Sequence, residues 1–538
     1  MKVSLQTLLN LVEVLAQENA QLRSENQQLK DEINRLKGEH GNPTFTGTSG
    51  KKTDISSEKE RKQRHSARSA PTDSPRPTKR ETIRIDRTET CLVNRDDLPS
   101  DAVFKGYENI MIQELRIIPD NVEYRREVFY SPSEHKTYRG ALPTGIQGEF
   151  GPGIRALIVT MKYVCNMSQP KILEFLQNFQ IEVSAAYISS VLTRNQSPFH
   201  DEKDALYQAG LTYGPFQHID DTAASENGEK RATHIVCNPL YTAYVTTERK
   251  DRLSVLDVLR NQAPRRFAFN AEARTLLERF GLSQTLRTRV EAEVPADTVL
   301  TETQIEAILQ PMQVGPRQHS RILEALAIAA YHQDTEWPVV TLLLCDDAPQ
   351  FKVLTEELAL CWIHDGRHYK KLTPLVPHHQ ALLDDFLTQY WDFYDQLLQF
   401  KQQPNDADVT RLSEEFEQLF STRTGYDLLD ERIAKTRSKK AELLAVLRHP
   451  ELPLHNNAAE LGARVQARFR DVSFQTRSEA GTRAKDTWMS IVQTAKKLGI
   501  SAYAYIYDRV SGTYALPSLA QVIQEKSQTL MSTCPAPP

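Results

Sequence analysis

Three acidic segments, far apart in the chain, hold the side chains best suited to chemistry. The segments FQHIDDT (residues 216–222) and VVTLLLCDD (residues 339–347) are apolar runs, typical of buried strands, that end in carboxylates. In the third segment, Glu460 lies near the start of a helical run, just after Asn456 and Asn457, where capping residues are expected. Carboxylates that converge from such elements can hold two divalent metal ions about 3.5–4 Å apart, which supports phosphoryl transfer on nucleic acid. Because clustered carboxylates repel, at least one would tend to stay protonated without a cation.

Each Asp-Asp pair also has a simpler interpretation. Asp220 with Asp221, or Asp346 with Asp347, could be no more than the turn that ends a strand, since Asp is common in turns. The order strand-Asp, strand-Asp, helix-Glu, with helical stretches between, favours a joint site. We therefore expect Asp220, Asp346 and Glu460 to converge.

The segments around these acids indicate the elements that must position them. Alternating runs at residues 231–236 and 241–247, split by Asn238 and Pro239, predict a hairpin beside the first strand. The run before Asp346 is almost continuous Val, Thr and Leu, so it predicts a central strand. Helical stretches at about 261–330 and 381–447 interrupt this core.

The N-terminal segment, residues 1–38, predicts a leucine zipper. Leucine recurs at every seventh position: Leu8, Leu15, Leu22, Leu29 and Leu36. If these are heptad position d, then position a holds Leu5, Val12, Asn19, Asn26 and Ile33. Asn at a favours a two-stranded, in-register coiled coil, so the pattern predicts a parallel homodimer. The alternative is a single amphipathic helix packed on the protein body.

Composition limits the class of protein. The 538 residues predict roughly three or four domains at about 150 residues each. No two of the six cysteines form a C-x-x-C pair, which argues against a disulfide framework or a zinc ribbon and fits a reducing cytoplasm. The N-terminus does not resemble a secretory signal, and the apolar runs are far shorter than the roughly 18 residues of a membrane span. We therefore expect a cytoplasmic protein with no membrane partner.

Three segments lie between the zipper and the acidic core. Residues 39–82 form a basic, Ser- and Pro-rich stretch that predicts a disordered linker, which either contacts phosphates or is merely solvated. Residues 83–149 predict a small β-rich module. Residues 150–210 predict a helical unit similar to a helix-turn-helix, in which Ser184 caps the last short helix. Tyr187 and Arg194 are its candidate DNA contacts, and an ordinary helical packing unit is the alternative.

Five short motifs occur together in this chain. The segment HIDDT (residues 218–222), Asp346 with Phe351, CWIH (residues 361–364) with Arg367, NNAAE (residues 456–460) and VSFQTRSEAG (residues 472–481) follow one another along the chain. Together they resemble the signatures of bacterial insertion-sequence transposases of the "sixty-six" type. The resemblance covers most of residues 145–510, and its last motif is the most specific.

The resemblance implies an α/β ribonuclease-H-like catalytic domain at residues 211–510, with the helical insertions inside it and a tail at residues 511–538. It also implies a DDE strand-transfer reaction with Asp220, Asp346 and Glu460 as the triad, while Asp221 matches a Glu of the family. Two Mg²⁺ ions, replaceable by Mn²⁺, suit such oxygen ligands. The chain departs from the pattern at Leu461, where Arg usually follows, and upstream, where the cysteines of a zinc module are missing.

Basic side chains follow the third acid closely. Helical spacing places Arg464 and Arg468 on the face of Glu460, and further arginines follow at Arg470 and Arg477. They could neutralise DNA phosphates near the cut, or they could form a solvated helix face.

Cys361 and His364 make only a weak zinc signal, so we favour a packing or hydrogen-bonding role for them.

The sequence thus predicts a DDE transposase that binds double-stranded DNA, both element ends and target, as a homo-oligomer. It would associate with the nucleoid when bound, and proteins encoded by the same element are further candidate partners. Two alternatives remain open: a catalytically silent, zipper-containing DNA-binding protein, and a metal-dependent nuclease without strand transfer.

Overall fold

The structure is a computed structural model that describes residues 2–36, 84–115, 117–146 and 148–533. The basic linker predicted for residues 39–82 lies outside the described residues.

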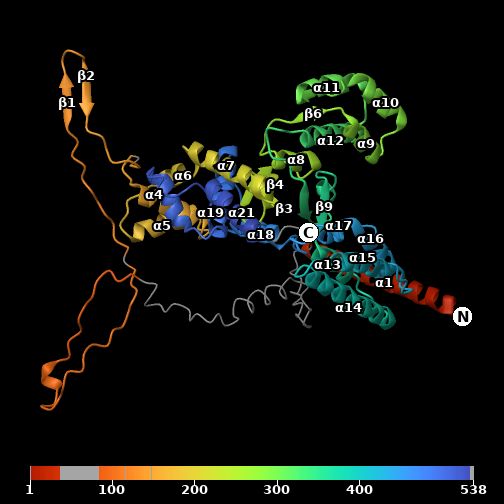
Figure 1. Ribbon diagram of the computed structural model, residues 1–538, viewed down its shortest axis with the longest axis horizontal. Helices are drawn as coiled ribbons and strands as arrows, with labels where there is room; N and C mark the ends of the chain where they lie inside the picture. Colours follow the sequence, from red (N-terminus) through yellow and green to blue (C-terminus); the bar gives the residue numbers. More distant parts are fainter. Residues whose placement is uncertain (1, 37–83, 116, 147, 534–538) are drawn as a thin grey trace.

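A five-stranded mixed sheet forms the centre of the protein (Figure 1). Strands β3 (Gln217–Glu226), β4 (Glu229–Cys237) and β5 (Thr242–Thr247) pair antiparallel, and β8 (Leu342–Cys345) and β9 (Glu357–Leu360) extend the sheet in parallel from β3. The strand order is β5-β4-β3-β8-β9, so the predicted hairpin and the predicted central strand are both present. This mixed α/β arrangement is compatible with a ribonuclease-H-like core.

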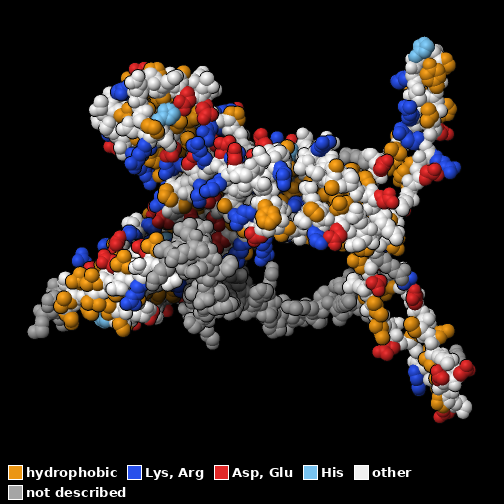
Figure 2. All heavy atoms as spheres, turned by 180° about the vertical axis from the view of Figure 1, so that it is seen from behind, with side chains coloured by type: hydrophobic (Ala, Val, Ile, Leu, Met, Phe, Trp, Pro, Cys, Tyr) orange, Lys and Arg blue, Asp and Glu red, His pale blue; other side chains and the backbone are white. Residues whose placement is uncertain are grey.

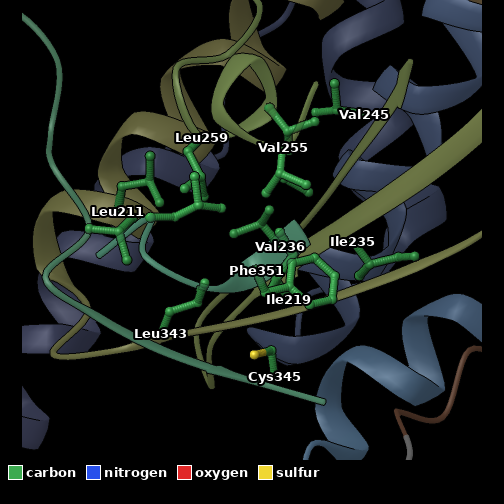
Figure 3. Close-up of a cluster of buried hydrophobic side chains, with 14 of the residues drawn as sticks. Leu211, Ile219, Ile235, Val236, Val245, Val255, Leu259, Leu343, Cys345 and Phe351 are labelled. Atoms are coloured by element: carbon green, nitrogen blue, oxygen red, sulfur yellow. The ribbon is translucent and has the colours of Figure 1, made fainter. Parts of the chain in front are cut away.

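The hydrophobic core is built around the strands that precede the two Asp pairs. All four residues of β8 are buried, which explains why its sequence is continuously apolar rather than alternating. Figure 3 shows Ile219 of β3, Ile235 of β4 and Leu343 of β8 in one cluster with Val255 and Leu259 of α8 (Arg252–Leu259). Burial on this scale makes the strand ends a rigid platform.

The edge strand β5 is covered by helix α19 (Glu479–Lys497). Three polar side chains on one face of this helix accept hydrogen bonds from alternate N–H groups of β5. The pairs are Asp486 with Thr246 (2.7 Å), Ser490 with Tyr244 (2.9 Å) and Thr494 with Thr242 (3.1 Å). Because an uncovered edge would invite pairing with other chains, this helix both satisfies the backbone and closes the sheet on that side.

A helical layer lies beside the sheet. It contains α4 (Pro152–Tyr163), α5 (Gln169–Asn178), α6 (Ala185–Thr193), α7 (Ser197–Tyr213), α20 (Ala502–Ser511) and α21 (Leu519–Thr533). Helix α20 packs on α4 and α21 packs on α7, so residues from the predicted C-terminal tail join the folded body. As expected, Ser184 caps α6: its Oγ accepts a hydrogen bond from the N–H of Tyr187 at 3.1 Å.

Two helical insertions leave the sheet. The first lies between β5 and β8 and contains β6 (Arg266–Ala268), α9 (Ala271–Arg279), α10 (Gln284–Glu293), β7 (Val299–Thr301), α11 (Glu302–Leu309), η2 (Gln310–Met312) and α12 (Pro316–His332). A short turn, η3 (Pro349–Phe351), follows β8. The second insertion, between β9 and α18 (Asn457–Ser473), contains α13 (Trp362–Lys370), α14 (Pro377–Phe400), α15 (Asp406–Phe420), α16 (Asp427–Arg437), α17 (Lys440–Leu443) and η4 (Ala445–Leu447).

Residues 84–149 form an extended arm rather than a packed unit. The described part has the short turn η1 (Arg95–Asp97) and one hairpin, β1 (Val128–Ser131) with β2 (Lys136–Arg139). Hydrophobic side chains lie open along the arm (Figure 2). Phe104 and Ile112 are among these exposed residues. A compact β-rich module is therefore not confirmed.

The N-terminal segment forms one helix, α1 (Lys2–Leu36), which lies beside α14 to α16 of the second insertion (Figure 1). Pairing of this helix with a second copy remains a prediction. Among the described residues, no helix combines the length and apolar character needed to cross a membrane.

Candidate active site

Asp220 and Asp346 occupy the same level on neighbouring parallel strands. In the register of β3 and β8, Gln217 lies opposite Leu343 and His218 lies opposite Leu344. Asp220 is two residues beyond His218, and Asp346 is two residues beyond Leu344. Because side chains alternate along a strand, equal steps from a matched pair place both carboxylates on the same face of the sheet.

The pKa values of Asp220 and Asp346 reflect their burial and the charges close to them. Burial raises the pKa of Asp220 to about 7; the N–H of Asp221 opposes this change, while the negative charges of Asp346, Asp221 and Glu460 add to it. Burial also raises the pKa of Asp346, against the hydrogen bond that its carboxylate accepts from the N–H of Ala348. The charges of Asp346 and Glu460 therefore both act on Asp220, and ionising Asp220 or Asp346 carries a cost.

Helix α18 brings Glu460 to this place because its first residues are tied to β3. The side-chain Nδ2 of Asn456 donates to the main-chain oxygen of Ile219 at 2.7 Å, and its Oδ1 lies 2.9 Å from Nδ1 of His218. Burial lowers the pKa of His218 to about 3, so this imidazole is neutral and can donate to Asn456. Asn456 stands at the N-cap as expected, but its side chain holds the strand instead of capping the helix.

One helical turn later, α18 touches the sheet directly. The hydroxyl of Tyr244 donates to the main-chain oxygen of Gly462 at 3.1 Å. A Cβ at Gly462 would lie 2.7 Å from the side chain of Ile235, so only glycine permits this close approach. Glu460 is thus positioned by contacts on both sides of it in the sequence.

Two basic side chains of α13 flank the carboxylate of Glu460. Nδ1 of His364 lies 3.6 Å from Oε1, and Nη2 of Arg367 lies 3.6 Å from Oε2. Arg367 also donates to Nε2 of His364 at 3.3 Å. Both His364 Nδ1 and Glu460 Oε1 are buried atoms without a hydrogen-bond partner in the described structure. Such a pair indicates a site built for a further group.

The second acid of each pair, Asp221 or Asp347, contacts other side chains. Asp221 lies 3.3 Å from Lys250 and accepts a 2.8 Å hydrogen bond from Gln350. Asp347 forms ion pairs with Lys352 and with Lys439 of the second insertion. Burial pulls the pKa of Asp347 upward, but its bonds to the two lysines outweigh this effect and lower the pKa.

The two acids of each pair therefore differ in the groups that surround them. Asp220 feels the charges of Asp346 and Glu460, whereas Asp221 and Asp347 are held by cations or amides. Sequence reasoning missed these partners, because Lys250, Gln350, Lys352 and Lys439 carry no spacing signal relative to the acids they meet. Gln350 alone was traceable, since it falls inside the second acidic motif.

The residues present fit a hard divalent cation. The carboxylates of Asp346 and Glu460 lie close enough to Asp220 for their charges to raise its pKa, and burial raises the pKa of both Asp220 and Asp346. Cys361 and His364 also come near Glu460, and one ligand atom from each of the three lies within 4.8 Å of the others. The thiol of Cys361 is fully buried, accepts the N–H of Asn456 at 3.3 Å and has its pKa raised by burial to about 12, which suits the predicted packing and hydrogen-bonding role.

The predicted DNA-contacting arginines fall into two groups. Arg464, Arg468 and Arg477 are exposed. Arg470 instead is half-buried and donates to the main-chain oxygen of Ala223 at 2.7 Å, which ties the end of α18 to β3. Next to it, Phe474 is 76% exposed and has φ of 58°, a conformation that is strained for a side chain of this type.

In the helical unit, the two candidate DNA contacts also differ in their exposure. Arg194 is exposed at the end of α6. Tyr187 is half-buried with its ring 4.3 Å from that of Phe150, and its hydroxyl is buried without a partner. The structure thus places Tyr187 in the contact between α6 and the segment before α4.

Fold and site together define a mixed α/β protein with a carboxylate centre on two neighbouring parallel strands. Asp346 follows the end of β8 as expected, but the expectation that Asp220 ends its strand is wrong, because β3 continues past it to Glu226. A family model described as "Transposase IS66 family" matches residues 329–484, a segment that holds both Asp346 and Glu460. The chain is also 30% identical over 324 residues to an uncharacterized protein, y4jO, of Sinorhizobium fredii (strain NBRC 101917 / NGR234). That match covers 60% of this chain and 100% of the relative. The chain belongs to the IS66 family of transposases.

Proposed function

We propose that this transposase cuts and joins DNA strands at the ends of its insertion sequence, with Asp220, Asp346 and Glu460 as the metal-binding triad. The observation that carries the proposal is the matched register of Asp220 and Asp346, with Glu460 near enough for its charge to raise the pKa of Asp220. A pair of Mg²⁺ or Mn²⁺ ions held there would supply an activated water or 3′-hydroxyl and would stabilise the leaving oxygen.

The protein groups around the triad have separate tasks in this proposal. His364 and Arg367 orient the carboxylate of Glu460 through contacts with its two oxygens. Asp221 and Asp347 stay bound to their cations and amides, so they keep the two strand ends in place without taking part in the chemistry. No side chain is needed as a covalent nucleophile.

The exposed arginines of α18 and the loop after it are the proposed DNA-contacting surface. Arg464 and Arg468 lie one and two turns beyond Glu460 on the same helix, so phosphates bound there would lie close to the triad. Duplex DNA is the proposed partner, and the compartment is the cytoplasm, where the nucleoid lies. Dimerisation through the zipper, and accessory proteins of the same element, belong to the same proposal.

The test uses the full chain, labelled DNA from the flanks of its own gene, and Mg²⁺. Cleavage followed by joining to a second duplex is the expected outcome, and Asp346→Asn should abolish both while DNA binding persists. Asp347→Asn is the matched control, because it removes the same charge one residue away. Cleavage without joining would point to a nuclease, and binding without cleavage would point to a silent DNA-binding protein.

A further inference from the structure

Helix α1 has two faces with different surroundings. Along one stripe, Gln6, Asn10, Glu13 and Gln17 recur at spacings of three and four residues, so they share one face of the helix. This stripe lies against the second insertion. In the heptad numbering it falls on positions b and f, on the side of the helix away from the a and d positions that form a zipper seam.

Glu13 is the centre of this contact. Its side chain is only 1% exposed, and its carboxylate accepts the N–H groups of Leu375 (2.7 Å) and Val376 (2.9 Å). Nδ1 of His379 lies 3.2 Å from the same carboxylate. These partners are the free N–H groups and the first turn of α14, where a helix end attracts negative charge. Burial raises the pKa of Glu13, but the hydrogen bonds outweigh it and the pKa is lowered, so the carboxylate is ionised.

A second contact lies one turn away, at the start of α16. Nδ2 of Asn10 donates to the main-chain oxygen of Gly425 at 3.0 Å, and its Oδ1 accepts the N–H of Asp427 at 3.4 Å. Gly425 has φ of 87°, and a Cβ there would lie 1.1 Å from Nε2 of Gln6. The ring of Tyr426 stacks on His379 at 4.3 Å, which joins the two contacts into one surface.

The opposite face of α1 is apolar and uncovered. Its described a and d leucines and valine are half or more exposed: Leu5 (59%), Leu8 (57%), Val12 (51%), Leu15 (55%), Leu22 (57%) and Leu29 (62%). Asn19 and Asn26, at position a, are exposed on the same stripe. An apolar heptad seam interrupted by Asn at a is the pattern of a two-stranded parallel coiled coil, so the seam matches a second copy of itself.

We propose that α1 is a two-sided joint: Glu13 and Asn10 clamp its back face to the second insertion of the same chain, while its front face pairs in parallel with α1 of a second copy. Dimerisation then holds two second insertions in one assembly. Each of these insertions also supplies His364, Arg367 and Lys439 to its own site. The zipper is thereby connected to the catalytic centre through folded protein.

This inference deepens the zipper dimer of the proposed function but does not rest on the strand-transfer chemistry. Two sets of variants of the full chain separate the two faces. Glu13→Ala should leave the light-scattering mass at twice the 61.3 kDa of one chain, yet speed hydrogen exchange at the amides of Leu375 and Val376 by about 10- to 100-fold. Leu15→Lys with Leu22→Lys should do the reverse: the mass falls to that of one chain and the amides stay protected.

Glu18→Ala is the matched control, because Glu18 is an exposed carboxylate on the same helix and should change neither readout. Unchanged exchange in Glu13→Ala would overturn the clamp. A double-lysine variant that still has twice the chain mass would overturn the pairing face, and exchange that rises with dissociation would show that the clamp acts between copies. If chain mass and amide exchange behave as expected but the parent chain does not cut and join DNA, that result would count against the proposed chemistry alone.

Discussion

The side-chain amide of Asn456 donates a 2.7 Å hydrogen bond to the main-chain oxygen of Ile219, the residue before Asp220. This bond joins the helix of Glu460 to the strand of Asp220 at the point where the two acids must meet. Its counterpart, between Asn456 and the neutral ring of His218, uses the other end of the same amide. One buried side chain therefore sets the separation of two members of the triad.

Asn456→Ala should lower the free energy of unfolding by about 1–3 kcal/mol, because it leaves the Ile219 carbonyl and the His218 ring buried without their partner. Strand cleavage should fall more than this loss of folded protein explains, since Glu460 loses its anchor. Chemical denaturation and a cleavage assay below the melting temperature measure the two effects. Leu461→Ala, exposed on the same helix, is the control.

The two acids of the second pair should separate catalysis from stability. Asp346→Asn should abolish metal-dependent cleavage with little loss of stability, whereas Asp347→Asn should keep activity and destabilise by roughly 1 kcal/mol, because Lys352 and Lys439 lose their partner. The native pKa of Asp347 is lowered, so its contribution is present at neutral pH and is lost as pH falls through that pKa. Denaturation of parent and Asp347→Asn at several pH values should therefore show a difference that narrows in acid. Loss of cleavage in Asp347→Asn with an intact fold would contradict this division.

Removing Asp220 should stabilise the metal-free protein. Its native pKa is about 7 against a usual value of 3.8, so ionising it in the folded state is unfavourable. Asp220 therefore does not destabilise the folded state below pH 3.8. Its destabilisation grows as pH rises from 3.8 toward 7 and is complete above 7. At pH 8 with a chelator, Asp220→Asn should exceed the parent in unfolding free energy by on the order of 1–4 kcal/mol.

The same comparison of the parent with Asp220→Asn should give a different result when a divalent metal ion is present. Mn²⁺ should raise the melting temperature of the parent, since binding to the folded state adds stability, and should not raise that of Asp220→Asn. Equal stabilisation of both proteins by Mn²⁺ would show that the ion binds elsewhere.

The sequence predicts the triad because each acid carries a signal in its own segment. Apolar runs that end in Asp220 and Asp346 indicate strands, and the spacing around Glu460 indicates a helix start. The strand end was predicted correctly for Asp346 but not for Asp220, because β3 continues to Glu226 in its hairpin with β4. The sheet then follows from ordinary pairing rules, which is why the hairpin and the central strand were predictable.

Contacts between distant segments were not predictable in the same way. Glu13 has the polar character of a solvated zipper face, yet it is buried against α14, since only the folded insertion creates the N–H groups that it fills. Lys439 lies between α16 and α17, outside every motif of the sequence, and only the fold brings it to Asp347. The arm at residues 84–149 has strand-like alternation, but alternation specifies a packed module only where a second layer covers one face.

The arginines of α18 provide the sharpest test of the proposed DNA surface, because the structure assigns two of them to solvent and one to the fold. Arg464→Ala and Arg468→Ala should each weaken binding of any duplex and flatten the slope of log affinity against log salt by about 0.9, if each contacts one phosphate. Neither should change the melting temperature. Arg470→Ala should do the opposite: it loses the bond to the carbonyl of Ala223, so the melting temperature falls while the salt slope of the remaining folded protein stays near that of the parent. Fluorescence anisotropy across a salt series, with a melting curve for each variant, measures both quantities. Equal salt slopes for Arg464→Ala, Arg468→Ala and the parent would mean that the DNA runs elsewhere, even if the triad is catalytic.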